Sequence, residues 1–287
     1  MRVEARAKIN WSLDITGQRE DGYHLMDMLM QPVTLSDTVE LAPAEALRLT
    51  VSGTPAIPAD ERNLAWRAAA ALREFTGYVG GASIHVTKRI PAGAGMGGGS
   101  ADAAAVLAGL NRLWGLHLPQ GELERIGLTL GADVPFCLRG GLTRTTGIGE
   151  VMQALPCSES YELVVVQPCE GLSTGAVFRA YHELEQVTRP DTDAARAALA
   201  RGDLALLARS LSNVLQPVSE ALRPEIREAV AALRDCGAAV ALMTGSGSAV
   251  FGVFAGTEAD GAYEALRLRW ERTWRCRTCQ ESLVIEE

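Results

Sequence analysis

The stretch PAGAGMGGGSADAA, residues 91–104, places five glycines in the seven positions from 93 to 99. Glycine held in folded structure is less favourable than alanine by about 0.5–1 kcal/mol per residue, so this concentration needs a function. Residues 82–90 alternate like a β-strand, and the residues from Ser100 onward are strong helix formers. A strand, a glycine loop and a helix N-terminus in this order offer backbone N–H groups to phosphate oxygens. The sequence therefore predicts a phosphate-binding loop, and a flexible connection is the alternative.

The loop also matches other glycine motifs in part. The spacing Gly93-x-Gly95-x-x-Gly98 fits the dinucleotide fingerprint, but that fingerprint needs an acid about 20 residues on, after a strand, to bind the ribose. The first acid after Asp102 is Glu122, which follows the predicted helix directly. The Walker A motif needs a lysine after the glycines, and the protein-kinase loop lies between strands with its lysine downstream; neither fits. A dehydrogenase is disfavoured but remains an alternative.

Lysine is almost absent from the chain, because only Lys8 and Lys88 among the 27 basic residues are lysines. Arginine supplies the other positive charges, so these two positions are candidates for sites that need a compact ammonium group. The alternative is that both are ordinary surface lysines that occur by chance. Composition alone leaves both interpretations open.

Whole-chain composition limits the class of protein. The 287 residues suffice for about two domains of roughly 150 residues each. A net charge of −8 disfavours nucleic acid as a partner, since such proteins generally carry a basic surface. Neither a signal sequence nor a run of about 20 apolar residues is evident, so no membrane partner is expected. Six scattered cysteines indicate free thiols, and we expect a cytoplasmic protein.

The pattern of predicted elements restarts near Pro156. Before it we expect a strand over 2–15, a strand pair within 24–43, a helix over 63–76, the strand and helix around the glycine loop, and a helix after 119. After it we expect a buried strand over 161–168, helices over 190–236, and a strand, glycine turn and strand over 239–254. We predict an N-terminal domain of residues 1–156 and a C-terminal domain of residues 157–287.

Three segments in order resemble the motifs of the GHMP small-molecule kinases: residues 5–28, the glycine loop, and LMTGSGSAVFGVF at 242–254. Residues 5–28, together with LGADVPFCLRGG at 130–141, are similar to the branch that phosphorylates 4-diphosphocytidyl-2-C-methyl-D-erythritol in the non-mevalonate isoprenoid route. The resemblance implies a two-domain α+β fold, with the active site in the cleft between an ATP-binding domain and a C-terminal GHMP domain. It implies ATP and Mg²⁺ as cofactors and the 2-hydroxyl of that small molecule as the acceptor.

The same resemblance implies roles for single residues. Lys8 and Asp133 match the catalytic pair, and Asn10 lies beside them. Asp133 would accept or orient the hydroxyl proton, and Lys8 would stabilise charge on the transferred phosphoryl group. Taken alone, Asp133 could instead be a helix N-cap and Lys8 a solvated strand residue.

Residues matching the nucleotide site are Asn63 and Lys88 near the adenine, then Pro91, Gly93, Gly95, Met96, Gly97, Gly98, Gly99, Ser100, Gly245 and Gly247 near the phosphates. Residues matching the substrate site are Asn10, Tyr23, His24, Thr174 and Phe178. The rings of Tyr23 and Phe178 would stack on the cytosine and His24 would bond to its edge, since stacking alone tolerates any base. Ordinary core packing is the alternative for both rings.

The chain departs from the family pattern in places. Ala101 replaces a frequent second hydroxyl after the loop serine, and SNVLQP at 212–217 replaces a more usual N-D-L-E. The metal ligands are therefore left open. Cys276 and Cys279 lack two further zinc ligands at suitable spacing, so we interpret them as incidental. Another GHMP kinase and a non-catalytic nucleotide sensor remain alternatives, and the chain is expected to be a monomer or a homodimer.

Overall fold

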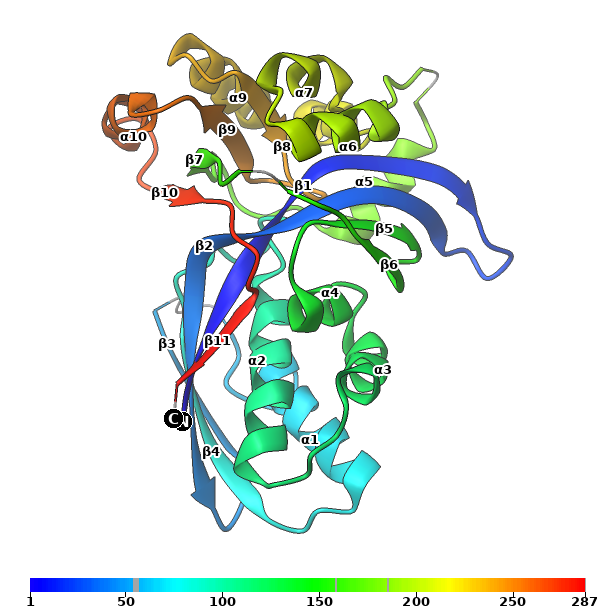
Figure 1. Ribbon diagram of the computed structural model, residues 1–287, viewed down its shortest axis with the longest axis vertical. Coiled ribbons are helices and arrows are strands. Elements are labelled where there is room, and N and C mark those ends of the chain that lie inside the picture. Colours follow the sequence, from blue (N-terminus) through cyan, green and yellow to red (C-terminus); the bar gives the residue numbers. More distant parts are fainter. Residues whose placement is uncertain (54–56, 158, 185, 287) are drawn as a thin grey trace.

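The structure is a computed structural model that describes residues 1–53, 57–157, 159–184 and 186–286. Within these residues the strands form one sheet of seven and one of four. Figure 1 shows helices α1 to α4 on one face of the larger sheet, and the smaller sheet covered by helices of the second half of the chain. The mixed helix and sheet content agrees with the predicted α+β class.

The larger sheet comes mainly from the first half of the chain. Its strand order is β11-β1-β2-β4-β3, with β5 paired to β2 and β6 paired to β5. Only β3 and β4 run parallel among its described pairs. The strands are β1 (Arg2–Gln18), β2 (His24–Ala44), β3 (Arg48–Ser52), β4 (Gly81–Thr87), β5 (Thr143–Gly147), β6 (Val151–Ala154) and β11 (Leu283–Glu286).

The prediction of a strand pair within 24–43 was wrong, because these residues form the single strand β2. Pro32 interrupts the strand-like sequence of these residues. It lies where the pairing partner of β2 changes from β5 to β4, and not at a turn. Residues 26–30 pair with β5, whereas residues 38–44 pair with β4. Proline lacks the N–H of a strand residue, which is why it is tolerated where the pairing changes.

The helices of the first half lie where the sequence predicts them: α1 (Leu64–Thr76), α2 (Gly98–Leu113) and α3 (Gln120–Leu130), with the short α4 (Val134–Arg139) after them. Small residues let α2 approach the sheet closely. A Cβ at Gly109 would lie 2.3 Å from Leu41 Cδ1 on β2. The alanine-rich sequence of α2 thus allows the helix that follows the glycine loop to pack tightly on the sheet.

The smaller sheet has the antiparallel order β10-β7-β9-β8. Its strands are β7 (Glu162–Val166), β8 (Val240–Met243), β9 (Val250–Phe254) and β10 (Thr273–Arg277). The helices of this half are α5 (Thr174–Tyr181), α6 (Thr192–Arg201), α7 (Leu204–Ser210), α8 (Gln216–Leu222), α9 (Glu225–Asp235) and α10 (Glu258–Arg267). Among the described helices, none combines the length and apolar character needed to cross a bilayer.

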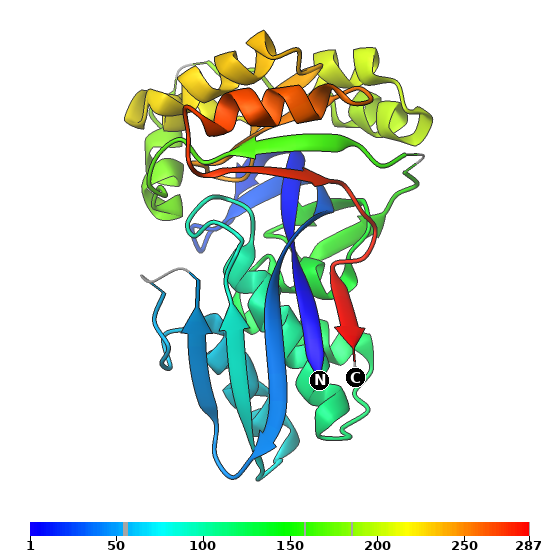
Figure 2. The same ribbon diagram turned by 90° about the vertical axis from the view of Figure 1, so that its left-hand side faces the viewer.

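The last strand returns to the first sheet. β11 pairs antiparallel with β1, where Arg2 lies opposite Glu286, and Figure 2 shows the two ends of the chain side by side. A strand from the predicted C-terminal domain therefore completes the sheet of the first half. The boundary at residue 156 stays a prediction.

Candidate active site

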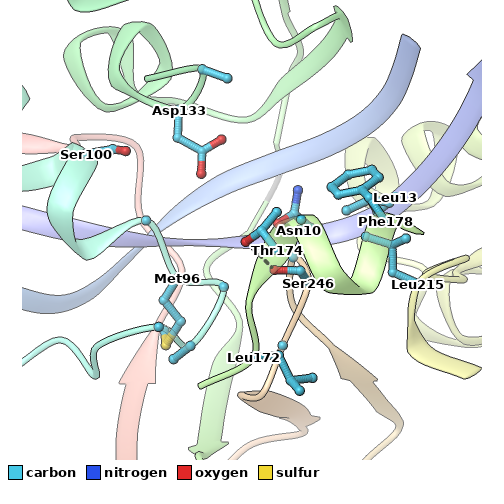
Figure 3. A pocket seen from close by; sticks show the side chains of 18 of the residues that line it. Asn10, Leu13, Met96, Ser100, Asp133, Leu172, Thr174, Phe178, Leu215 and Ser246 are labelled. Atoms are coloured by element: carbon cyan, nitrogen blue, oxygen red, sulfur yellow. Dashed lines mark hydrogen bonds between the residues drawn. The ribbon is translucent and has the colours of Figure 1, made fainter. Parts of the chain in front are cut away.

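A cavity of about 1100 Å³ lies between the glycine loop, β1, α5 and the turn that joins β8 to β9. Figure 3 shows Asp133 and Ser100 toward one side of it and Phe178 toward the other, with Asn10 and Thr174 between them. Of the residues matched from the family, Asn63 alone does not line this cavity. Those that do are Lys8, Asn10, Tyr23, His24, Lys88, Pro91, Gly93, Gly95, Met96, Gly97, Gly98, Gly99, Ser100, Asp133, Thr174, Phe178, Gly245 and Gly247.

One edge of β1 brings the separate motifs together. The backbone N–H of Lys8 donates to the carbonyl of Met96 in the glycine loop at 3.0 Å. Two residues on, the N–H of Asn10 donates to the hydroxyl of Thr244 at 3.0 Å. Leu13 N–H then donates to Ser212 O at 3.1 Å. Alternate residues of a strand present their N–H groups to the same edge, and a register shift between Asn10 and Ser12 brings Leu13 onto the edge used by Lys8 and Asn10, so β1 aligns the motifs along one line.

Lys8 and Asp133 meet in the cavity. The Lys8 Nζ lies 3.4 Å from Asp133 Oδ2 and donates to Asn10 Oδ1 at 2.7 Å. The Lys8 side chain is 5% exposed and that of Asp133 is 32% exposed, so the carboxylate remains accessible to a ligand. Asp133 does occupy the N-cap position of α4, but its side chain makes no capping hydrogen bond. The carboxylate is therefore free for another role.

The glycine loop has the geometry that its sequence predicts. Gly93, Gly95 and Gly97 have φ values of 61°, 75° and 71°, in the left-handed region that favours glycine. Gly97 is the N-cap of α2 and supplies no side-chain cap. The first N–H groups of α2 are thus left for an anionic ligand.

The turn after β8 packs against this loop, backbone to backbone. A Cβ at Gly95 would lie 2.2 Å from Thr244 O, and one at Gly245 would lie 2.8 Å from Gly95 O. Glycine is therefore required on both sides of the contact. The same turn also contacts α5, where the hydroxyl of Ser246 lies 3.0 Å from that of Thr174 (Figure 3).

Aromatic rings line the end of the cavity away from Asp133. The His24 ring stacks on Phe178, with ring centroids 4.6 Å apart. His24 Nε2 lies 2.8 Å from Nε2 of His182, so the two rings share one hydrogen bond. Partial burial, and then the neighbouring His182, lower the pKa of His24. Tyr23 is 61% exposed, so it is not a core residue.

Two residues assigned near the adenine have other contacts. Asn63 is the N-cap of α1: its Oδ1 accepts from Ala65 N–H at 2.9 Å, and its Nδ2 donates to Pro58 O at 2.8 Å. Lys88 lines the cavity floor, but its ammonium group donates to Asp37 and to Asp102. Both side chains therefore also have structural contacts within the protein.

Three residues that contribute contacts to the site were not identified from the sequence: Thr244, Ser246 and His182. The first two are hydroxyl residues within the TGSGS motif, whose glycines alone were selected. His182 carries no local signal, because it meets His24 only through the packing of α5 against the start of β2.

The arrangement offers three chemical regions in one cavity. Backbone N–H groups at the loop can bind phosphate oxygens, Lys8 and Asp133 can stabilise a transferring group and accept a proton, and the rings around Phe178 can stack on a planar group. Among the described residues, no three or more His, Cys, Asp or Glu side chains are arranged to hold a metal ion, and the six cysteines are free.

Comparison with known proteins identifies a family and several relatives that this chain resembles. The family model "GHMP kinases N terminal domain" matches residues 63–141, and "GHMP kinases C terminal" matches residues 195–272. The chain is 45% identical over 280 residues to a protein of Symbiobacterium thermophilum named 4-diphosphocytidyl-2-C-methyl-D-erythritol kinase, covering 97% of this chain and 99% of that protein. It is 40% identical to the protein of that name from Alkaliphilus metalliredigens, covering 95% and 94% of the two chains.

Solved structures of kinases are also similar to this chain. A crystal structure of 4-(cytidine 5'-diphospho)-2C-methyl-D-erythritol kinase superposes with a TM-score of 0.83 at 36% identity, covering 97% of this chain and 99% of that one. A mevalonate kinase of L. major in complex with R-mevalonate superposes with a TM-score of 0.75 at 17% identity, covering 98% and 96% of the two chains. At that identity the second match concerns the fold alone.

Proposed function

The chain belongs to the GHMP kinase family, and on that premise we propose that it transfers the terminal phosphoryl group of ATP to the 2-hydroxyl of 4-diphosphocytidyl-2-C-methyl-D-erythritol, a step of isoprenoid precursor synthesis. The observation that carries the proposal is the single cavity that joins a phosphate-binding loop, the Lys8 and Asp133 pair, and a ring cluster able to stack on a base. Full-length similarity to relatives of that name supports the same substrate.

Asp133 and Lys8 would carry the chemical step. The substrate oxygen forms a bond to the terminal phosphorus while the bond from that phosphorus to the ADP oxygen breaks, and the hydroxyl proton passes to Asp133. Lys8, 3.4 Å from that carboxylate, stabilises charge on the transferring phosphoryl group. Asn10 holds the ammonium group through its side-chain oxygen. Positioning and electrostatics supply most of the rate in such reactions.

The nucleotide and the substrate would approach from opposite ends of the cavity. The loop from Pro91 to Ser100, with Gly245 and Gly247 opposite, would bind the ATP phosphates through backbone N–H groups. Phe178 and Tyr23 would stack on the cytosine and His24 would bond to its edge, while Thr174 would lie near the diphosphate. Asn63, the N-cap of α1, and Lys88, which lines the cavity, would lie near the adenine.

Mg²⁺ is the expected metal, and the donor set fits it. Mg²⁺ in kinases is held by one or two protein oxygens plus substrate phosphates, so no all-protein cage is needed. The Ser100 hydroxyl at the start of α2 lines the cavity beside the loop and is the candidate protein oxygen. When bound, the ion neutralises phosphate charge. A cytoplasmic location and a monomeric or homodimeric state remain predictions.

An ADP-release assay over a panel of alcohols tests the proposed function. With ATP and Mg²⁺, we expect ADP release with the cytidyl substrate and none above background with mevalonate, homoserine or galactose. The uridine analogue of the cytidyl substrate is the matched control for base recognition. Comparable turnover of homoserine or galactose would contradict the assignment.

A further inference from the structure

Two histidines from distant parts of the chain meet at the aromatic end of the cavity. His24 is the first residue of β2, and His182 is the C-cap residue of α5. Their Nε2 atoms lie 2.8 Å apart, and their ring centroids lie 4.9 Å apart. The His24 ring also stacks on Phe178, which Figure 3 shows at the end of the cavity away from Asp133. We call His24 and His182 the histidine pair.

A hydrogen bond between two Nε2 atoms constrains the protons of both rings. One ring must donate an Nε2–H group, and the other must accept with an Nε2 that carries no proton. A neutral imidazole that accepts at Nε2 carries its proton on Nδ1, whereas one that donates at Nε2 has no proton on Nδ1. Among the described residues, Nδ1 of His24 has no hydrogen-bond partner. The bond to His182 therefore decides whether this nitrogen donates to a ligand or accepts from one.

The surroundings of the two rings set the direction of the bond. His24 is partly buried against Phe178, whereas His182 is exposed. Partial burial, and then the neighbouring His182, lower the pKa of His24. A positive charge on the histidine pair is therefore more favourable on the exposed ring. A charged His182 carries protons on both nitrogens and can only donate, which places the proton of His24 on Nδ1.

The titratable and charged groups near the histidine pair come from several elements. Asp21, in the turn before β2, and Arg179, on α5, line the main cavity with both rings. Arg189 and Tyr181 line a second cavity of about 280 Å³ that both rings also border. Arg189 forms an ion pair with Asp14 on β1 at 2.6 Å. Because the two rings share these neighbours, the difference in exposure is what separates them.

The proton on Nδ1 matters because cytosine and uracil present opposite groups to a ligand-binding site. N3 of cytosine accepts a hydrogen bond, whereas N3 of uracil carries a proton and donates. An Nδ1–H group held in place can therefore bond to cytosine N3 and leaves uracil N3–H without an acceptor, which is an effective way to reject a ligand. A histidine that is free to move its proton between nitrogens can suit either base.

We propose that His182 is a positioning residue for base recognition: it donates to Nε2 of His24, holds the proton of His24 on Nδ1, and so makes the site select cytosine over uracil. The proposal rests on the proposed function in taking a cytidyl group as the ligand at this end of the cavity. Stacking on Phe178 supplies affinity that both bases share, so selection between them depends on the histidine pair.

The ratio of kcat/KM for the cytidyl substrate to that for its uridine analogue tests the selection. His182→Phe keeps a ring and removes both nitrogens, so the ratio should fall at least about tenfold, mainly through a higher KM for the cytidyl substrate. His182→Gln retains an N–H donor on a side chain of similar length and should keep the ratio within about threefold of wild type. His85→Phe is the matched control, because His85 bonds to Thr50 and does not line the cavity. Its ratio should equal that of wild type.

Nitrogen NMR of the four histidines reads the tautomer without any substrate. Near neutral pH, His24 should carry its proton on Nδ1 in wild type and in His182→Gln, and should be a mixture of tautomers in His182→Phe. An equal ratio of kcat/KM in wild type and His182→Phe, or the same tautomer of His24 in both, would overturn the proposal. If the tautomer changes as expected but wild type turns over no cytidyl substrate, only the proposed function is overturned.

Discussion

Lys8 and Lys88 differ in the exposure of their carboxylate partners, and this difference separates their roles. Both lysines are almost fully buried, both line the same cavity, and both contact carboxylates. The carboxylate partner of Lys8 is Asp133, which is one-third exposed, lies 3.4 Å away and makes no side-chain capping bond to α4. Lys88 lies between two carboxylates that are at most 4% exposed. We call Lys8 with Asp133 the open pair, and Lys88 with Asp37 and Asp102 the closed cluster. The partly exposed carboxylate of the open pair can respond to a ligand, whereas the closed cluster fixes the backbone around it.

Composition could not separate these tasks. The scarcity of lysine marked both positions as candidates, and in the structure both side chains are buried. The difference lies in the partners, which come from elements distant in the sequence: Asp133 precedes α4, whereas Asp37 lies on β2. Substitutions at each site should therefore affect different measurements.

The largest effect is expected for Asp133→Asn, at the open pair. The amide keeps the shape but cannot accept the hydroxyl proton, so kcat should fall by roughly 10²- to 10⁴-fold with little change in the Kd for ATP. Steady-state kinetics and calorimetry measure the two quantities. A kcat within tenfold of wild type would show that Asp133 only positions the substrate.

Lys88→Met should act on stability. Removing the ammonium group leaves two buried carboxylates unpaired, and the free energy of unfolding should fall by about 3–5 kcal/mol in urea denaturation. Lys8→Met is the matched control, because water can reach Asp133 when its partner is lost, and its stability should fall less. Equal losses for the two variants would remove the distinction between an open pair and a closed cluster.

Lys8→Arg tests the open pair with its charge retained. A guanidinium is larger than an ammonium group and points its donors in fixed directions, so kcat should fall at least about 100-fold, or about 2.7 kcal/mol. The melting temperature and nucleotide binding should stay near wild type. Full activity would mean that Lys8 is an ordinary charged strand residue.

Phe178→Ala examines the end of the cavity that neither lysine reaches. Loss of one stacking face should raise the KM for the cytidyl substrate by about 5- to 100-fold, the equivalent of about 1–3 kcal/mol, without changing the KM for ATP. Phe178→Tyr retains the ring and is the control. If both variants raise the KM equally, the ring does not stack on the base.

Local signals in the sequence predicted the loop and the elements around it well. Glycines at 93, 95 and 97 require left-handed backbone, and the structure has it. Asn63 was selected from the family resemblance alone, but an asparagine directly before a helix is also a strong N-cap signal, and in the structure it caps α1. Asp102 shows what the sequence does not reveal: an acid near a helix N-terminus is favoured by position alone, and packing of α2 against the sheet buries it. Burial of that kind depends on tertiary contacts and leaves no local pattern.

The edge of β1 also has a consequence for the order in which the chain folds. Its N–H groups find their partners on segments remote in sequence, as in the bond from Asn10 to Thr244, 234 residues apart. Contacts of such separation form slowly, and until they form β1 presents an unpaired strand edge on which another chain can add. The loops that cover this edge are the same ones that build the cavity. When these loops close over β1, the protein therefore forms its active site and covers the aggregation-prone strand edge in the same folding step.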